Sequence, residues 1–450
     1  MSYCGLSMNS DAATGATEFS PQVRRVTLEK QSEIRIQVPQ ISPLKLRVLH
    51  GKVEIFGSEL LRNVWLTFPP LQQFAVFTWY GATLEIDGVT ETDNTSVETP
   101  MVSYLSIHNS LQVQRHRVTS STRDYVSSQG PRVIIVGDTD SGKSTLAKML
   151  LSWAAKDGCK PTFVDLNIGQ SSITIPGTIA ATSVEMPVDP VEGLPLHKAL
   201  VHYFGHNTAT NNVRLYKYLV EELARELEEE FAINAESRRS GMVIDTMGWT
   251  SGLGYQLLLH AIRIFNASLV IVLGQETELV YDLNKAFKFK KNVQILNLER
   301  SSGVFSRLSD FRKMLRNISI QRYFSGATNN LTAYTKTAKF TDMQVYRIGA
   351  LLEKSRSTEP LRITPVLIDK DLVNTVLAIS YAKQPHHIIS SIVAGFVYIT
   401  DVDLGEERIT YLSPSAAESI SKRNSITPNI ECSELPAKIF IMGTLTWHKT

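Results

Sequence analysis

The sequence predicts an α/β protein with three domains: a central domain on a mostly parallel sheet, an N-terminal all-β domain and a C-terminal mixed, β-rich domain. Three observations predict this fold. The chain has 450 residues, more than one hydrophobic core usually supports. Near residue 140 a β-branched run enters a glycine-bounded loop and then a segment with helical apolar spacing. Short alternating apolar runs, typical of antiparallel strands, lie on both sides of that region.

Changes in pattern divide the chain into five expected segments. Between Val26 and Gly88 short alternating runs are separated by Gly and Pro, and a helix-like stretch from Val102 to Val118 follows. Strand-like runs return after Gly326 and include an expected hairpin around 401–407. We expect a disordered N-terminus (1–20), an N-terminal β domain (21–118), a linker (119–130), a central domain with a lid (131–326) and a C-terminal domain (327–450).

Bulk composition excludes several classes of protein. With 43% hydrophobic and 20% charged residues the chain is neither disordered nor a coiled coil, and because 46 basic and 44 acidic groups nearly cancel, any RNA site must be local. The cysteines Cys4, Cys159 and Cys432 lie far apart, which suits a reducing compartment and offers no zinc site. No secretory signal is visible, and the apolar stretch Leu253–Leu273 is interrupted by His, Arg and Asn, so we expect no membrane span.

The segment Val133–Leu146, VIIVGDTDSGKSTL, carries the strongest motif in the chain. Gly137, Gly142, Lys143 and Ser144 match the P-loop pattern G-x-x-x-x-G-K-[ST], with the strand before it and the helix after it that the pattern requires. Glycines let the backbone N–H groups point inward at phosphates. Lys143 is expected to reach the β- and γ-phosphates and Ser144 to hold Mg²⁺. The central domain is therefore predicted to be a P-loop NTPase domain.

Two further strand ends supply candidate carboxylates. We expect Asp165 and Asn167 to lie on one face of a strand, with Asn167 nearer its carboxyl end, although only the carboxylate can accept a proton. Asp245 ends the apolar run Met242–Ile244 and has the form of a Walker B residue, with a turn cap as the alternative. Ligands of such sheets bind at the carboxyl ends of the strands, so these residues are expected to meet the P-loop.

Basic residues after residue 280 suggest two further roles. Arg307, Arg312 and Arg316 follow a Ser-Ser-Gly turn at intervals of five and four and predict a lid that closes on phosphate, or else a solvated helix face. A second group, interleaved with Phe287 and Phe289, could track an RNA backbone or form the outside of an amphipathic helix. Its members are Lys285, Lys288, Lys290 and Lys291. The chain shows no N-K-x-D motif after the P-loop, which weakens a GTPase interpretation.

Several stretches resemble the eukaryotic Clp family of polynucleotide 5′-hydroxyl kinases, and most closely its plant members. They are GDTDSGKST, VDLNIGQSSITIPGT, DTMGW, the Arg307–Arg312 segment, FTWYGATLEIDGVTE and EIFGSEL. The resemblance covers nearly the whole chain. It implies a nuclear ATP-binding subunit of the pre-mRNA 3′-end cleavage and polyadenylation machinery, bound to a Pcf-type scaffold partner. Some members of the family phosphorylate RNA 5′-hydroxyl ends and associate with the tRNA splicing endonuclease.

The resemblance also implies roles for individual residues. Glu33 would contact the nucleotide, and Arg307 and Arg312 would belong to the lid. Residues expected at the ATP phosphates are Asp140, Ser141, Gly142, Lys143, Ser144 and Thr145, and those expected to clasp RNA are Thr246, Gly248 and Trp249. Two positions depart from the family pattern, which has Asp in place of Asn167 and a nucleotide-contacting Lys in place of Gln73.

The missing carboxylate decides the leading hypothesis. Because Asn cannot take a proton from a 5′-hydroxyl, and a positioned general base is worth roughly 10²–10⁴-fold in rate, we expect an ATP-binding subunit whose kinase activity is weak or lost. One alternative is an active ATP-dependent RNA kinase in which Asp165 or Asp245 serves instead. Another is a scaffold paralogue that binds no nucleotide.

Overall fold

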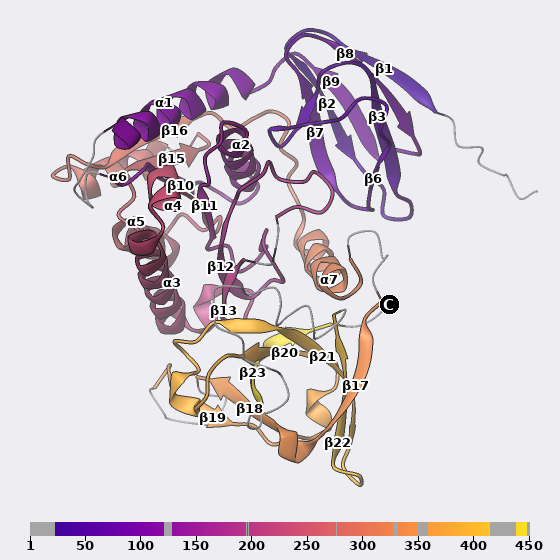
Figure 1. The fold of residues 1–450 in the computed structure, drawn as a ribbon, viewed down its shortest axis with the longest axis vertical. Helices are drawn as coiled ribbons and strands as arrows, with labels where there is room; N and C mark the ends of the chain where they lie inside the picture. Colours follow the sequence, from indigo (N-terminus) through magenta and orange to yellow (C-terminus); the bar gives the residue numbers. More distant parts are fainter. Residues whose placement is uncertain are drawn as a thin grey trace, which may run out of the picture.

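The computed structural model describes residues 23–120, 128–194, 196, 198–275, 277–326, 332–349, 359–414 and 438–447. The expected disordered N-terminus, 1–20, and the centre of the expected linker, 121–127, lie outside the described residues. In Figure 1 the N-terminal strands lie at the upper right, the helix-covered central sheet at the left and the C-terminal strands below. Helix α7 (Ser309–Ser325) lies between the N-terminal and C-terminal strands.

The N-terminal domain is a sandwich of two antiparallel sheets. Apolar side chains of both sheets, such as Ile34, Leu46 and Leu84, are buried between them and form a separate core. The Glu54 carboxylate of this domain accepts hydrogen bonds from the Trp79 indole at 3.0 Å and from the Trp153 indole of the central domain at 2.9 Å. The strands are, in sheet order, β1 (Arg24–Leu28), β8 (Ala82–Asp87), β3 (Leu44–Gly51) and β6 (Leu66–Phe68), then β5 (Ser58–Glu59), β4 (Glu54–Ile55), β7 (Gln73–Thr78), β2 (Ser32–Gln37) and β9 (Thr92–Ser96).

The central sheet has seven strands in the order β13-β12-β11-β14-β10-β15-β16, and the five from β11 to β16 are parallel. Strands β12 and β13 extend it in the antiparallel sense. Every residue of β10, β14 and β15 is buried, as expected for strands covered on both faces. The strands are β10 (Arg132–Val136), β11 (Thr162–Asp165), β12 (Thr178–Ser183), β13 (Leu200–Tyr203), β14 (Met242–Asp245), β15 (Leu269–Leu273) and β16 (Gln294–Leu298). Because β11, β14 and β10 are neighbours, the three predicted strand ends meet at one edge.

Helices cover this sheet, and one of them comes from before the P-loop. Helix α1 (Met101–Ser120) packs against α2 (Lys143–Lys156) and α4 (Ala235–Ser240). Its buried residues Tyr104, Ile107 and Leu111 belong to the core of the central sheet rather than to the N-terminal sandwich core. Its apolar face is therefore buried by the central domain. The remaining helices are α2 (Lys143–Lys156), the 3-10 helix η1 (Ala209–Asn211), α3 (Val213–Ile233), α4 (Ala235–Ser240), α5 (Leu253–Ile264) and α6 (Thr277–Phe287).

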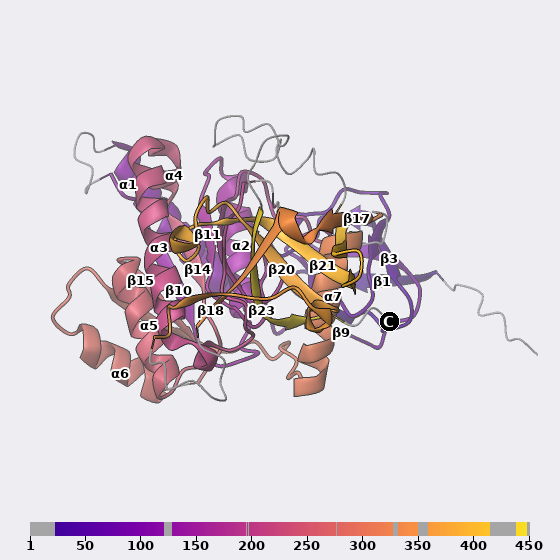
Figure 2. The same ribbon diagram turned by 90° about the horizontal axis from the view of Figure 1, so that it is seen from below.

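The C-terminal domain is a second seven-stranded sheet, antiparallel except for the parallel pair β18 and β23. Alternate residues of its strands face two cores: Leu377 faces the sheet's own core, and Ala378 faces the core of the central domain. The two domains touch at Gly205 and Gly443, where a Cβ on Gly443 would lie 2.2 Å from the Gly205 carbonyl oxygen. In Figure 2 this sheet crosses in front of the central domain. Its elements are β17 (Tyr334–Lys339), η2 (Phe340–Asp342), β18 (Met343–Ile348), β19 (Ile363–Pro365), η3 (Lys370–Leu372), β20 (Thr375–Ser380), η4 (Pro385–His387), β21 (Val393–Asp403), β22 (Arg408–Ser413) and β23 (Lys438–Thr446).

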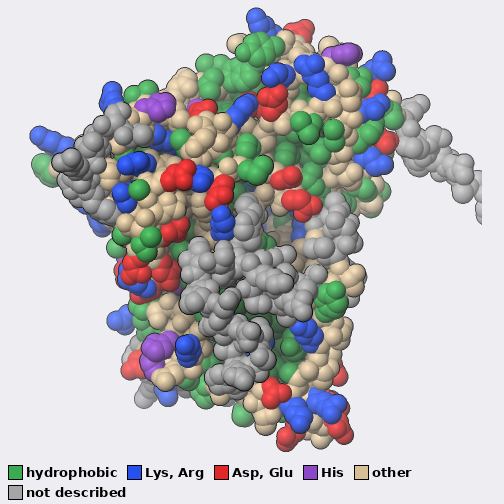
Figure 3. Space-filling view, viewed as in Figure 1, with side chains coloured by type: hydrophobic (Ala, Val, Ile, Leu, Met, Phe, Trp, Pro, Cys, Tyr) green, Lys and Arg blue, Asp and Glu red, His purple; other side chains and the backbone are tan. Residues whose placement is uncertain are grey.

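The predicted fold class is confirmed in all three domains. The apolar stretch Leu253–Leu273 forms helix α5 and strand β15, and among the described helices none has the length and apolar character to span a membrane. On the face drawn in Figure 3, blue Lys and Arg side chains are interspersed with red Asp and Glu, in keeping with the nearly balanced charge.

Candidate nucleotide-binding site

A cleft of about 680 Å³ opens at the carboxyl ends of the parallel strands, where α/β sheets bind their ligands. Its walls come from the P-loop, helix α7 and the five-stranded sheet β5-β4-β7-β2-β9 of the N-terminal domain, here called the N-terminal sheet. Most of the predicted site residues line it. They are Glu33, Gln73, Asp140, Ser141, Gly142, Lys143, Ser144, Thr145, Asn167, Gly248, Trp249, Arg307 and Arg312. Three predicted residues, Asp165, Asp245 and Thr246, lie behind its wall.

The P-loop joins strand β10 to helix α2 as predicted. Gly137, with φ 145°, runs so close to β15 that a Cβ there would lie 2.4 Å from the Leu273 carbonyl oxygen. Gly142, with φ 96°, is the N-cap of α2. Lys143 is 6% exposed, and its ammonium donates to the carbonyl oxygens of Gly137 and Asp138 at 2.8 and 2.5 Å. A buried cation beside a helix N-terminus makes this loop suited to an anion.

Asp245, the last residue of β14, reaches the P-loop from behind. Its fully buried carboxylate accepts the Ser144 hydroxyl at 2.5 Å and the Thr246 backbone N–H at 2.9 Å. Burial raises the pKa of Asp245, and the nearby Lys143 charge and the Ser144 hydrogen bond oppose that rise. A hydroxyl and a carboxylate are the oxygen ligands that Mg²⁺ takes in P-loop proteins, so the pair fits this metal. Among the described residues no group of three or more His, Cys, Asp or Glu could hold a metal ion.

The prediction that Asp165 and Asn167 share one face of a strand is wrong. Strand β11 ends at Asp165, whose carboxylate accepts the Asn167 backbone N–H at 2.9 Å and so turns the chain. Asn167 lines the cleft, whereas Asp165 is fully buried behind it. The second Asp165 oxygen accepts the Ser171 hydroxyl at 3.1 Å and the Ser172 N–H at 2.6 Å. Burial, followed by the charge of Asp245, raises the pKa of Asp165 to about 7.

The DTMGW segment after β14 places its three predicted RNA contacts differently. Thr246 is 2% exposed and donates its hydroxyl to the Ile135 carbonyl at 2.8 Å, so its side chain does not line the cleft. Its expected contact with RNA stays a prediction. Gly248 and Trp249 do line the cleft. Gly248 is pressed against the P-loop: a Cβ would lie 2.4 Å from the Thr139 backbone, and the Thr139 hydroxyl donates to the Gly248 carbonyl at 3.0 Å.

The lid arginines face both the P-loop and the N-terminal sheet. The Arg307 backbone N–H and the Arg312 guanidinium donate to one oxygen of the Asp140 carboxylate, each at 2.8 Å. The Arg307 guanidinium also donates twice to the Gln73 carbonyl oxygen, at 3.0 and 2.9 Å. The buried Nε of Arg312 has no hydrogen-bond partner in the described part of the chain, which leaves a donor for an anion. Arg316 of α7 lines the same cleft.

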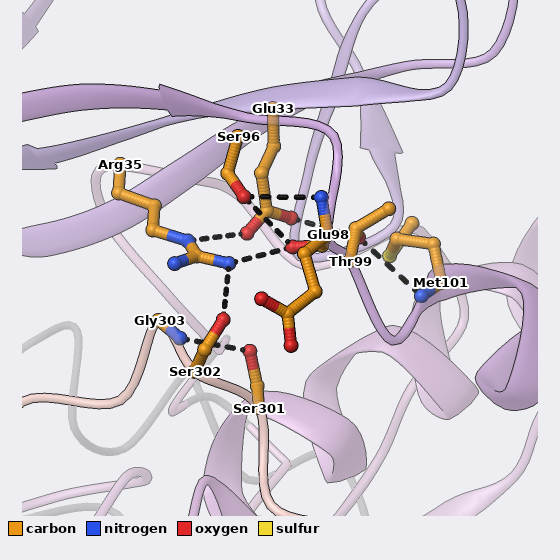
Figure 4. A network of polar contacts seen from close by, with 9 residues as sticks. All are labelled: Glu33, Arg35, Ser96, Glu98, Thr99, Met101, Ser301, Ser302 and Gly303. Carbon is orange, nitrogen blue, oxygen red and sulfur yellow. Dashed lines mark hydrogen bonds and ion pairs between the residues drawn. The ribbon is translucent and has the colours of Figure 1, made fainter.

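Glu33 belongs to the polar network drawn in Figure 4. One oxygen of its carboxylate accepts Arg35 Nε at 2.6 Å and the other accepts the Thr99 hydroxyl at 2.9 Å. The Arg35 guanidinium also donates to the Glu98 carbonyl at 2.8 Å and to the Ser302 hydroxyl at 3.2 Å. This network joins the N-terminal sheet to the segment that leads into the lid.

Sequence reasoning missed several residues of the cleft. Lys148 follows Ser144 by one helical turn, a spacing that places both on one face of α2 and could have revealed it. Its Nζ lies 5.0 Å from the centre of the Phe56 ring, and burial lowers its pKa. Phe56, with φ 51°, stands in the turn between β4 and β5, and no local signal marked it. Arg35 follows Glu33 by two residues on β2, the spacing of one strand face.

The second basic group lies away from this cleft. Helix α6 ends at Phe287, which is buried, and Phe289 beyond the helix is 91% exposed. None of the four lysines lines the cleft within the described residues; they are Lys285, Lys288, Lys290 and Lys291. Their expected contact with RNA stays a prediction.

Comparison with protein-family models matches three consecutive parts of the chain. Residues 27–118 match the N-terminal beta-sandwich domain of polyadenylation factor. Residues 137–326 match the mRNA cleavage and polyadenylation factor CLP1 P-loop, and residues 331–449 match pre-mRNA cleavage complex II protein Clp1. The three matched parts contain the sandwich with most of helix α1, the P-loop domain after strand β10, and the C-terminal sheet, in that order.

Relatives match along nearly the whole length. Protein CLP1 homolog 5 of Arabidopsis thaliana is 68% identical over 96% of this chain and 100% of that protein. Polyribonucleotide 5′-hydroxyl-kinase Clp1 of Homo sapiens is 37% identical over 89% of this chain and 94% of that protein. The solved Clp1p–Pcf11p complex has the same fold, with a TM-score of 0.81 and 23% identity over 96% of this chain and 99% of that chain. The chain therefore belongs to the Clp1 family of mRNA cleavage and polyadenylation factors.

Proposed function

We propose that this protein is an ATP-binding subunit of the pre-mRNA 3′-end cleavage and polyadenylation complex, with weak or lost kinase activity. One observation carries the proposal: a complete P-loop with its Ser144–Asp245 pair shares the cleft with an amide, Asn167, in the turn that follows β11. The P-loop parts that would bind phosphates line the cleft, and Asn167 offers no proton acceptor at the position where the family resemblance implies a carboxylate.

The residues of the cleft suit ATP with Mg²⁺. The P-loop backbone, Lys143 and the unpartnered Nε of Arg312 would bind phosphates, and Ser144 with Asp245 would hold Mg²⁺, which neutralises phosphate charge when bound. Glu33 and Gln73 line the same cleft from the N-terminal sheet. Bound ATP would join the two domains and stabilise the folded protein by mass action.

Proton transfer is the step that the cleft supports poorly. Asn167 has no basic oxygen, and Asp165 is buried with its carboxylate engaged by the Asn167 and Ser172 N–H groups. Asp245 is occupied by Ser144. A general base must come within hydrogen-bond reach of the proton it removes. We infer that phosphate transfer to an RNA 5′-hydroxyl is slow.

An active RNA 5′-hydroxyl kinase is the second candidate. Arg307 and Arg312 face the P-loop, and arginines at such a position stabilise the charge of a phosphoryl group during its transfer. The animal relatives that are 37% identical are named as such kinases. A third candidate, a nucleotide-free scaffold, is favoured by no contact in the cleft.

The proposed setting follows from the family. A Pcf11-type scaffold partner is supported by the solved complex of the structural neighbour, and a nuclear location by the role of mRNA cleavage factors. RNA as a ligand, and an association with the tRNA splicing endonuclease, belong to this proposal as consequences of the family resemblance.

Two measurements on the purified full-length protein test the proposal. Nucleotide released on denaturation should be ATP, close to one per chain, and Lys143→Ala should abolish it. In a 5′-hydroxyl RNA kinase assay, Asn167→Asp should raise the rate by roughly 10²–10⁴-fold over wild type. Asn207→Asp is the matched control. It introduces a carboxylate elsewhere in the same cleft, and this carboxylate should not raise the kinase rate. A wild type that phosphorylates RNA as fast as an Asp-bearing relative, with no gain in Asn167→Asp, would establish the active kinase instead. A protein unable to bind ATP would establish the scaffold.

A further inference from the structure

The segment Ser301–Arg307, here called the lid approach, rests on the N-terminal sheet at two places. The first is Arg35 of β2. Its guanidinium donates to the Ser302 hydroxyl, and it is held in turn by the Glu33 carboxylate and the Glu98 carbonyl. Figure 4 shows the guanidinium between Glu33 and Glu98 on one side and Ser302 of the lid approach on the other. Because Arg35 is only 7% exposed, it has little freedom to move.

The chain at Gly303 lies so close to Arg35 that a side chain there would force a movement. A Cβ on Gly303 would lie 2.4 Å from Arg35 Nε and 2.7 Å from Cζ. Such a contact is far inside van der Waals distance, so a larger residue at 303 must displace either the lid approach or the guanidinium. The close packing makes Arg35 the surface against which the lid approach is placed.

The second place is Gln73 of β7, which holds the lid arginine itself. The Gln73 carbonyl oxygen accepts both Arg307 Nε and a terminal Arg307 nitrogen, at 3.0 and 2.9 Å. The carboxamide is neutral, so it orients the guanidinium without cancelling its charge, as a carboxylate would. The other contact of Arg307 is its backbone N–H to Asp140 in the P-loop. Arg307 is thus fixed from the sheet and from the P-loop together.

We propose that Arg35 and Gln73 are positioning residues of the ATP site: they hold the lid approach against the N-terminal sheet so that Arg307 is presented to the phosphates. Gln73 then acts through Arg307 and not by touching the nucleotide. This inference rests on the proposed ATP binding. It assigns the N-terminal sandwich the task of setting the lid, since both contacts come from its sheet.

A double-mutant cycle on the full-length protein, read out as the dissociation constant of ATP with Mg²⁺, tests the role of Gln73. We expect Gln73→Ala to weaken ATP binding about 5- to 10-fold in wild type and less than about 2-fold in the Arg307→Ala background. If Gln73 touched the nucleotide directly, the two losses would multiply, and that result overturns the inference. A wild type that binds no ATP refutes the proposed function and this inference with it.

Three further variants serve as the control, the replacement for a misfolded variant and the test of Arg35. Gln37→Ala removes the same amide from the residue directly opposite Gln73, where it donates to the exposed Glu91, and should leave ATP binding unchanged. If Gln73→Ala unfolds early, Gln73→Met removes the carbonyl at similar length and takes its place in the cycle. Gly303→Ala should weaken ATP binding to a similar degree as Gln73→Ala, because its Cβ collides with Arg35. Unchanged binding in folded Gly303→Ala removes Arg35 from the proposal.

Discussion

Asp165 and Asp245 occupy equivalent positions on neighbouring parallel strands and have different tasks. They are paired in register at the ends of β11 and β14, and both are fully buried. Asp245 bonds the P-loop hydroxyl of Ser144, whereas Asp165 bonds the backbone and side chain of the loop that follows its own strand. Of two carboxylates in one row, one belongs to the phosphate site and the other shapes the loop that carries Asn167.

The difference teaches that the direction in which the chain turns after a strand decides which groups the last carboxylate of that strand contacts. After β14 the chain continues along the P-loop, with Gly248 against Thr139. After β11 it turns at once and covers Asp165. The missing acid at Asn167 therefore has no substitute in Asp165, although the two lie two residues apart.

The largest expected effect separates the two carboxylates by their use of magnesium. Asp245→Asn should weaken ATP binding in the presence of Mg²⁺ by roughly 10- to 100-fold, because it removes a charged oxygen from the Ser144 site. Asp165→Asn should change it by less than about 3-fold. Titration of ATP with and without Mg²⁺ measures both. Equal losses in the two variants would break the distinction between the two strand ends.

A smaller effect is expected on stability against pH. Since burial and Asp245 raise the pKa of folded Asp165 to about 7, the unfolded chain releases this proton at lower pH than the folded one, and the free energy of unfolding falls as pH rises from about 4 to 7. Asp165→Asn removes that loss. The unfolding free energy of the variant, taken relative to that of wild type, should therefore rise by about 1–2 kcal/mol from pH 5 to pH 7.

Urea unfolding without magnesium at both pH values measures the gain. Asp371→Asn, at an exposed residue of η3, is the control and should show no change with pH. A gain that does not depend on pH would mean that Asp165 is ionised in the folded protein throughout this range.

The smallest effect concerns the loop after β11. Ser171→Ala removes a hydroxyl that donates to Asp165 and accepts the N–H groups of Ile173 and Thr174, and should cost about 1 kcal/mol of unfolding free energy. It should leave magnesium-dependent ATP binding unchanged, which the same titration checks. A loss of magnesium dependence in this variant would connect the two strand ends functionally.

Local patterns were sufficient to predict the P-loop and the strands around it. The defining residues lie within eight positions, Gly137 to Ser144, and their spacing carries the chemistry. The buried strands β10, β14 and β15 are continuous apolar runs, a pattern that needs no partner to be recognised. The short antiparallel strands β12 and β13 were missed because they carry no comparable run.

The contacts that complete the cleft could not be predicted in this way. Gln73 and Arg307 lie 234 positions apart in the chain, and Arg35 and Ser302 lie 267 apart. Glu33 and Gln73 were placed at the site by family resemblance alone, which did not foresee that Gln73 would hold the lid. The resemblance also placed Thr246 at RNA, and packing buries it.

The sequence by itself determined the phosphate-binding loop, the apolar strands beneath it and the amide at Asn167, because each depends on residues close together in the chain. Only the tertiary structure decided which buried carboxylate reaches the P-loop and which residues hold the lid arginine. The physical reason is that both depend on the direction of a turn and on the packing of one domain against another, and a hydrogen bond forms only within about 3 Å, a closeness that sequence spacing does not specify.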